Sequence, residues 1–258
     1  MTHQPFIEKV RRFIDLDDEH EALLTHLQGE TVAYQPGDQV YMDASEQCEF
    51  FVVTSGWFYA YATLPDGSVQ VHDIYHPGDI VGLDHLTWGI ATSSVSAASE
   101  GTLTCIKTDR ARRMMFRHPT ISAVFYSMHM LTNVLLLDRL TAVARLSAYN
   151  SLAYFLTDAY TRRMASEARE MENTGRLIMP LTQDFIADCL GLSAVHVSRQ
   201  FKKLAENGII ERIDRKTIQI NDTQRLFKMS DYVDRYENIE RLDLSDKSFP
   251  FATIANQA

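Results

Sequence analysis

The chain has 258 residues, of which 45% are hydrophobic and 23% charged, so it is long enough for two domains and has the composition of an ordinary soluble globular protein. No apolar run approaches the roughly 20 residues needed to cross a bilayer, and the N-terminal segment lacks the apolar core of a signal peptide. We therefore expect a cytoplasmic protein with no membrane partner. Its three cysteines, Cys48, Cys105 and Cys189, form no Cys-x-x-Cys pair or Cys/His cluster, and we predict no metal and no other cofactor.

The net charge of −9 is unevenly distributed along the chain. Residues 1–108 contain 4 Lys and Arg against 16 Asp and Glu, whereas residues 181–228 contain 8 against 6. The span 193–203 holds three cations and no acidic residue. Because affinity for DNA depends on local neutralisation of phosphates, the overall negative charge does not exclude DNA binding by the C-terminal part.

Residues 1–108 are predicted to contain short helices followed by a β domain. Residues 6–29 have Leu and Ile at helical spacing. After them come short β runs with glycine or proline at nearly every corner: ETVAY, QVYM, EFFVV, WFYAYAT, SVQVHDIY, IVGLDHL, SVSAAS and TLTCIK. Pro65-Asp66-Gly67 predicts a hairpin turn between the fourth and fifth runs. Many short strands with regular turns and no long helical pattern between them predict an antiparallel jelly-roll barrel.

Residues 109–146 are predicted to be helical. Asp109 suits an N-cap, and Pro119 suits the first turn of a long helix that ends near Ala144. That helix has an apolar seam with members three and four residues apart, and further apolar residues on its other faces, so it must pack on two sides. We expect one side to cover the barrel and the seam to pair with its twin in a two-fold dimer. The predicted dimer interface consists of Ile121, Val124, Met128, Leu131 and Leu135. The alternative is a core helix of a monomer.

A hinge is expected between Arg139 and Arg145, after Asp138 has interrupted the seam. Ser147 is then predicted to cap a helix that runs to about Met164. The polar stretch SEAREMENTGR that follows is predicted to be an exposed loop.

Residues 147–232 are predicted to form a winged helix-turn-helix. In LTQDFIADCLGLSAVHVSRQFKK, residues 181–203, Gly191 lies in a tight turn between two short helical patterns. Beyond Asn207-Gly208, the runs IIERI and TIQI predict a hairpin that serves as a wing. Asp222 is predicted to cap a final helix through about Tyr232, and residues 233–258 form a tail without an assigned structure. The predicted fold class is therefore α+β.

The second helix of this unit has one face suited to DNA. An advance of 100° per residue puts Val197, Phe201 and Leu204 on the buried face. The predicted DNA-contacting residues are Gln183, Ser193, Val195, His196, Ser198, Arg199, Lys202, Lys203 and Lys216. Ser193 is the expected N-cap, and its end of the helix offers free N–H groups to a phosphate.

Arg199 is the strongest candidate for base recognition, because its planar fork matches the O6 and N7 acceptors of guanine. Val195 can pack its methyl groups on a thymine methyl, while Lys202 and Lys203 are expected to reach phosphates. The alternative is a solvated basic face on an ordinary pair of helices.

The order of barrel, long helix and winged helix-turn-helix resembles the CRP/FNR family of transcription regulators. The resemblance covers roughly residues 25–230 and includes LPDG before SVQVHDIYHPGDIVGLDHL, and LTQDFIADCLGLSAVHVSRQFKKLAENGII. It implies a homodimer that binds double-stranded DNA at a partly palindromic site. It also implies contact with RNA polymerase, or occlusion of it.

The sequence departs from the family pattern in three places. Members with the E-x-x-S-R reading motif have a glutamate where this chain has Val195, although Ser198 and Arg199 match. Cyclic-nucleotide-binding members carry an arginine for the phosphate, but Lys107 is the only lysine or arginine between Asp73 and Thr108. We therefore expect an effector other than a typical cyclic nucleotide. The oxygen-sensing branch has a cysteine cluster that is missing from this sequence.

Other functions remain as alternatives. A haem-responsive regulator would need a barrel histidine, for which His72, His76 and His85 are candidates. Oxidation of Cys189 would make a redox-responsive regulator. A jelly-roll metal enzyme would need two or three histidines and a carboxylate that converge on one metal. A module that binds a ligand or protein without binding DNA is the last alternative.

Overall fold

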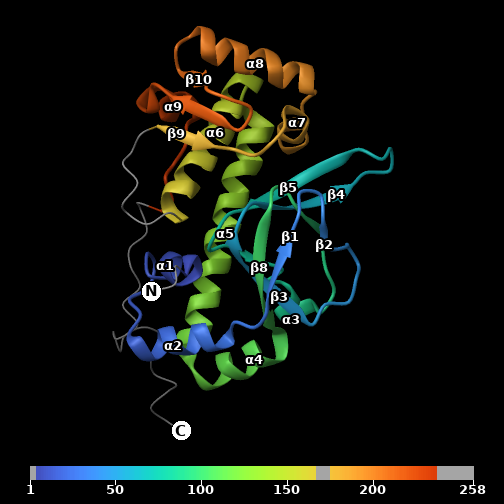
Figure 1. Cartoon of the computed structure of the whole chain (residues 1–258), viewed down its shortest axis with the longest axis vertical. Helices are drawn as coiled ribbons and strands as arrows, with labels where there is room; N and C mark the ends of the chain where they lie inside the picture. Colours follow the sequence, from blue (N-terminus) through green and yellow to red (C-terminus); the bar gives the residue numbers. More distant parts are fainter. Residues whose placement is uncertain (1–3, 167–174, 237–258) are drawn as a thin grey trace. The chain divides into compact units, whose positions relative to one another are not determined.

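The computed structural model describes residues 4–166 and 175–236 and divides them into two compact units (Figure 1). The first unit is built from residues up to Phe58, from Tyr75–Val134 and from Arg235 onward. The second unit consists of Tyr59–Ile74 and Leu135–Asp234. Each unit is described by itself below.

Two short helices begin the first unit, as the spacing of apolar residues predicts. They are α1 (Pro5–Val10) and α2 (Asp18–Leu27). The carboxylate of Asp17 accepts the His20 N–H at 2.8 Å and so caps α2. A buried ion pair between Lys9 and Asp79 ties α1 to the turn before β6 (Ile80–Val81).

The β runs form two four-stranded sheets, which confirms the predicted barrel. One sheet has the strand order β1-β8-β3-β6 and the other β2-β7-β4-β5. The remaining strands are β1 (Thr31–Tyr34), β2 (Gln39–Tyr41), β3 (Glu49–Ser55), β4 (Phe58–Thr63), β5 (Val69–Tyr75), β7 (Ser94–Ala97) and β8 (Gly101–Lys107). The run IVGLDHL is only partly a strand, because its last two residues open a short helix, α3 (His85–Trp88).

The predicted hairpin turn lies between β4 and β5. Gly67 has φ +84°, a left-handed conformation that favours glycine, and the Leu64 N–H donates to the Ser68 carbonyl at 2.8 Å. The Asp66 carboxylate accepts the Ser68 N–H at 3.0 Å. The turn is therefore closed by both backbone and side-chain bonds, as its composition predicts.

Two helices follow the barrel, and one predicted boundary is wrong. Helix α4 (Thr108–Arg117) already begins at Thr108, so Asp109 lies in its first turn, where it pairs with Arg112 at 3.3 Å and caps nothing. Helix α5 (Pro119–Arg145) starts at the predicted proline and runs one residue past Ala144. The expected hinge at Arg139–Arg145 is thus regular helix, and the helical path is broken only at Leu146 and Ser147.

The seam of α5 that was expected to form the dimer interface is covered by the chain's own residues. All five of its members are buried: Ile121, Val124, Met128, Leu131 and Leu135. Phe125, next to the seam residue Val124 in sequence, is buried as well, and its ring meets that of Phe50 edge-on at 5.6 Å. This burial contradicts the choice of these five residues as the surface that meets a second chain.

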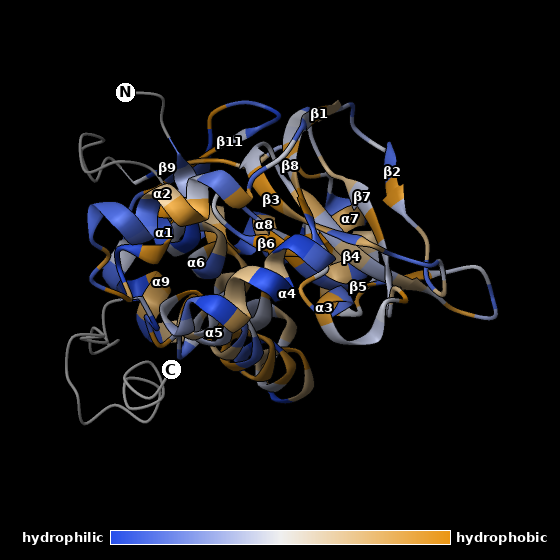
Figure 2. Cartoon of the chain, turned by 90° about the horizontal axis from the view of Figure 1, so that it is seen from below, coloured by the Kyte–Doolittle hydropathy of each residue, from blue (hydrophilic) through white to orange (hydrophobic). Residues whose placement is uncertain are grey.

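A different stripe of α5 is exposed. Its members follow one another by four and three residues: Tyr126, Met130, Asn133, Leu137, Leu140 and Ala144. Hydrophobic residues, orange in Figure 2, recur along the ribbon of this helix. By length and composition α5 could cross a membrane, with a mean hydropathy of 1.4 in its most apolar window. Packing of the helix on two opposite sides gives the same composition.

The second unit contains the predicted C-terminal elements and one additional strand. Helix α6 (Ala148–Ser166) is capped by Ser147, whose hydroxyl accepts the Asn150 N–H at 3.3 Å. A three-stranded sheet of order β10-β11-β9 consists of β9 (Arg176–Ile178), β10 (Ile210–Arg212) and β11 (Thr217–Ile220). Helix α9 (Thr223–Ser230) ends two residues before the predicted boundary and is capped by Asp222 as predicted. Most of the stretch SEAREMENTGR and of the tail lies outside the described residues.

Candidate nucleic-acid interface

Two short helices joined at Gly191 form the predicted helix-turn-helix. Helix α7 (Gln183–Leu190) is capped by Thr182, whose hydroxyl accepts the Phe185 N–H at 3.1 Å. Gly191 ends α7 with φ 63° and ψ 34°, the left-handed conformation that glycine adopts without steric cost. Helix α8 (Ala194–Glu206) begins three residues later.

The N-terminus of α8 has two features that favour an anion. Ser193 is the N-cap, as predicted, and its hydroxyl accepts the His196 N–H at 3.3 Å. The first turn contains no acidic residue, so the positive end of the helix dipole is not offset by a carboxylate of that turn. Ser193 itself is exposed. These features suit a phosphate group.

One face of α8 packs on the rest of the second unit, and the opposite face is exposed. Val197 and Leu204 are fully buried, whereas Phe201 is only half-buried and Gln200 takes its place in the interior. The exposed face presents Val195, 69% exposed, together with Ser198, Arg199, Lys202 and Lys203, while His196 is half-buried beside it. Arg199 has no hydrogen-bond or ion-pair partner in the part of the chain that the structure describes. Its guanidinium is therefore available to an outside acceptor.

The two lysines of α8 differ in their surroundings. Lys202 pairs with Glu206 one turn later at 3.7 Å, and both side chains are largely exposed. The ammonium of Lys203 lies 4.7 Å from the ring centroid of Tyr149 on α6, in a cation–π contact. The Tyr149 hydroxyl also accepts a hydrogen bond from Asn207 at 2.8 Å. Lys203 thus helps to hold α8 on α6, a role that the helical wheel did not reveal.

The wing is a tight, basic hairpin. Strands β10 and β11 pair in antiparallel register, and β9 extends the sheet on the other side of β11. At its tip the Asp214 carboxylate accepts the Lys216 N–H at 2.7 Å. This bond and the hydrogen bond from the Thr217 hydroxyl lower the pKa of Asp214. Lys216 is exposed, as are Arg212 and Arg215, two wing cations absent from the predicted set.

Gln183 and Cys189 belong to α7. Gln183 is the first residue of α7, next to the Thr182 cap, and is half-buried. It is not part of the exposed face of α8. Cys189 is buried, and burial raises its pKa, so the thiol stays protonated. A protonated, covered thiol is a poor target for oxidants. Cys189 therefore acts as a packing residue, on a small cavity that it lines together with Val71 of β5, Val143 of α5 and Phe155 of α6.

The barrel histidines do not converge. His72 is exposed, His76 is buried with its ring 4.2 Å from that of Trp57, and His85 is fully buried. His85 Nδ1 donates to the Glu49 carbonyl at 2.7 Å, and its ring fills the space next to Gly82. Among the described residues, no group of three or more His, Cys, Asp or Glu side chains is placed to hold a metal ion.

A capped helix-turn-helix with a basic wing is a DNA-binding module, and family comparisons agree with this assignment. A model of the Crp-like helix-turn-helix domain matches residues 151–229, and a model of the cyclic nucleotide-binding domain matches residues 31–118. The nitrogen fixation regulation protein FixK of Rhizobium meliloti is 28% identical over 195 residues, which cover 75% of this chain and 83% of the relative. The transcriptional activator protein FnrL of Cereibacter sphaeroides is 24% identical over 196 residues, which cover 76% and 78%.

Solved structures share the fold. FixK2 from Bradyrhizobium japonicum superposes with a TM-score of 0.71 at 20% identity, covering 79% of this chain and 98% of the other. A CooA mutant from Carboxydothermus hydrogenoformans gives a TM-score of 0.64 at 20% identity, covering 83% and 92%. The two matched domains, in this order, and the relatives are those of CRP/FNR-type DNA-binding transcription regulators. The alternative of a jelly-roll metal enzyme is wrong, because the relatives are regulators of transcription.

Proposed function

We propose that the protein is a homodimer that regulates transcription from a partly palindromic DNA site, with one α8 helix in each of two successive major grooves. The exposed cationic face of α8, with its unpartnered Arg199 and its capped N-terminus, carries this proposal. Two such helices one helical turn of DNA apart would read two half-sites.

Individual residues have distinct proposed roles. Arg199 reads a guanine through a bidentate pair of hydrogen bonds, worth about 1–3 kcal/mol of discrimination. Val195 has no hydrogen-bonding group and is well exposed, so it favours an apolar contact such as a thymine methyl. Ser193, Ser198, Lys202 and the wing residue Lys216 bind phosphates and fix the register. Gln183, His196 and Lys203 border this surface and complete the set.

The exposed stripe of α5 is the proposed dimer interface. It is an a/d stripe of coiled-coil spacing, and its large members Tyr126, Met130, Leu137 and Leu140 are 40–61% exposed in one chain. A soluble chain rarely leaves such a stripe uncovered. Asn133, in the middle of the stripe, is a polar residue of the type that fixes register and the number of helices. A second copy of α5 would cover the stripe by the same surface on both chains.

The effector, if the barrel has one, is proposed to be different from a typical cyclic nucleotide. Lys107, the lone cation of β6–β8, is engaged by Glu49. Arg112 on α4 donates to the Leu86 carbonyl at 2.9 Å and to Asp109, so it closes the C-terminal end of α3. A buried phosphate would lack a free cationic partner among these residues. The burial of Cys189 gives no support to the redox alternative, and the burial of His76 and His85 among the chain's own residues gives none to either as a haem ligand.

The protein is proposed to act in the cytoplasm and to bind DNA without a cofactor. It would affect transcription by contact with RNA polymerase or by occlusion of it. Selection of random duplex DNA by the purified full chain, followed by mapping of bound sites in cells, tests this proposal. We expect an enriched motif with two inverted half-sites, each containing a guanine. Substitution of Arg199 should remove preference for that guanine. Enrichment of no motif would refute the proposed function.

A further inference from the structure

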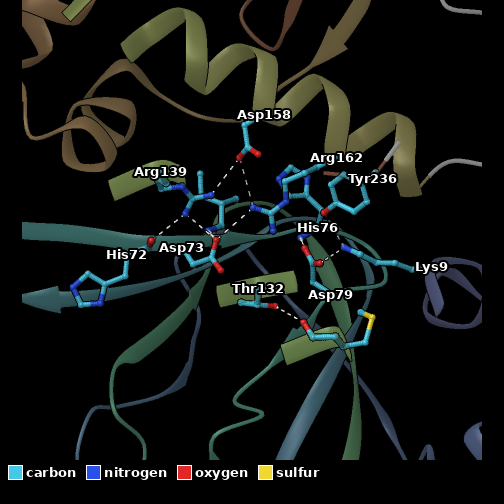
Figure 3. Close-up of polar contacts among 12 residues, drawn as sticks. Lys9, His72, Asp73, His76, Asp79, Thr132, Arg139, Asp158, Arg162 and Tyr236 are labelled. Carbon is cyan, nitrogen blue, oxygen red and sulfur yellow. Dashed lines mark hydrogen bonds and ion pairs between the residues drawn. The ribbon is translucent and has the colours of Figure 1, made fainter. Parts of the chain in front are cut away.

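Four charged side chains of the second unit form a buried cluster that joins three separate elements (Figure 3). Arg139 on α5 pairs with Asp73 on β5 at 2.8 Å and with Asp158 on α6 at 3.3 Å. Arg162, one turn after Asp158, pairs with Asp73 at 3.4 Å and with Asp158 at 3.7 Å. Each carboxylate thus contacts both guanidinium groups.

The cluster is balanced in charge and shielded from water. Its side chains are only 3–15% exposed. Burial alone would lower the pKa of Arg139, but Asp73 and Asp158 outweigh it and raise the pKa, so the residue stays charged. The neighbouring apolar side chains Val71 and Leu190 help to line a cavity of ≈ 10 Å³, no larger than one water molecule. In such surroundings the loss of one charge leaves its partners without compensation.

The same arginine also fixes the β4–β5 hairpin beside α7. Arg139 donates a second hydrogen bond to the His72 carbonyl at 3.0 Å. Two residues earlier, the Gln70 side chain donates to the Asp188 carbonyl of α7 at 2.9 Å. The rings of Tyr59 on β4 and Phe185 on α7 meet edge-on at 4.8 Å. Helix α7 therefore packs on the β4–β5 hairpin, which Arg139 binds in turn.

The direction of the DNA-binding module relative to α5 depends on these contacts. Only Leu146 and Ser147 separate α5 from α6, and they are not helical. One further bond across the bend joins the Ser151 hydroxyl to the Ala142 carbonyl at 3.1 Å. Helix α6 packs on α7, α8 and α9, so any rotation of α6 moves the recognition helix.

We propose that Arg139 is a positioning residue for DNA recognition, which sets the place of α8 relative to α5 through Asp73 and Asp158. The segment around Arg139 is then an anchor between helices rather than a flexible hinge. This inference rests on the proposed function, since it concerns how two α8 helices are spaced on one DNA site. Arg139 itself need not touch DNA.

The test is a half-site spacing profile measured with the full-length protein. The probes are duplexes with the motif selected by the wild type, in which the spacer between half-sites is changed by one or two base pairs. One base pair moves a half-site by about 3.4 Å and turns it by about 35°. We expect the wild type to lose about tenfold in affinity per step. Arg139→Gln should bind the best spacer more weakly and lose about threefold or less per step, because α8 is no longer held in one position.

Three further variants make the outcome decisive. Arg113→Gln removes an exposed arginine of α4 and should leave the wild-type profile unchanged. Asp73→Asn and Gln70→Ala weaken the same anchor without removing Arg139, and should flatten the profile if Arg139→Gln does not fold. Affinity for a single half-site should be the same in all variants that fold. A steep wild-type profile retained in the anchor variants would overturn the inference, whereas failure of the wild type to select any motif would overturn the proposed function instead.

Discussion

Replacing Leu137 and Leu140 together by alanine is expected to weaken the proposed homodimer about a thousandfold. The two side chains are 54% and 61% exposed in one chain. Full burial of a leucine side chain is worth about 1.5–3 kcal/mol, so covering the exposed half of each contributes about 1 kcal/mol. Two chains bring four such side chains to the interface, for a total of about 4 kcal/mol, and each 1.4 kcal/mol is a factor of ten.

Sedimentation equilibrium over a dilution series measures the dissociation constant directly. Leu64→Ala is the matched control, because Leu64 is 44% exposed in the β4–β5 turn, away from α5 in sequence. The control should dissociate as the wild type does. By contrast, Val124→Ala in the buried seam should lower the free energy of unfolding by about 1–3 kcal/mol. If the Leu137/Leu140 variant dimerises as tightly as the wild type, the exposed stripe is not the interface.

Three further outcomes are expected. Arg199→Ala should abolish preference for guanine in each half-site. Lys202→Ala should instead weaken binding to all sequences alike and reduce the slope of log affinity against log salt concentration by about 1. If both variants affect all sequences equally, Arg199 does not read a base. Lys9→Ala, which removes the cation beside the buried carboxylate of Asp79, should cost about 3–5 kcal/mol in urea unfolding, against less than about 1 kcal/mol for Lys107→Ala in an exposed pair. Equal losses would refute the buried-pair reasoning. Burial lowers the pKa of His85 in the folded state, so the unfolded chain binds more protons below about pH 6.5. The free energy of unfolding should therefore fall as the pH drops from 7.5 to 5.5. His85→Gln should show a shallower fall when unfolding is measured at each pH, and parallel curves for the two proteins would refute this reasoning.

The structure changes the expected role of the segment around Arg139, which was predicted to be a hinge. A hinge at Arg139–Arg145 was expected because Asp138 interrupts the apolar seam and Ser147 suits the N-cap of a new helix. Instead, Arg139 finds two carboxylates from β5 and α6, and the helix continues. A charged residue in an apolar helical pattern marks either a break in the helix or a charge that is paired with another in the interior. The sequence pattern is the same in both cases.

Much of the fold follows from local sequence. The turn at Pro65-Asp66-Gly67, the caps Ser147, Ser193 and Asp222, and the turn at Gly191 between α7 and α8 were all predicted correctly. These features depend on bonds between residues close in the chain, and their chemistry is specific to a few residue types. The exposed face of α8 follows in the same way from the 3.6-residue period of a helix.

Long-range packing decided the rest. Helix α5 has apolar residues on every face, so its periodicity could not show that the seam around Val124 and Leu131 is covered while Leu137 and Leu140 are exposed. Lys203 has the charge of a phosphate-binding residue, but Tyr149, 54 residues earlier, draws it onto α6. The sequence by itself determined most of the elements and caps and the exposed face of α8. Only the tertiary structure decided which surface is free for a partner, because that depends on which distant residues fold back to cover each side of a helix.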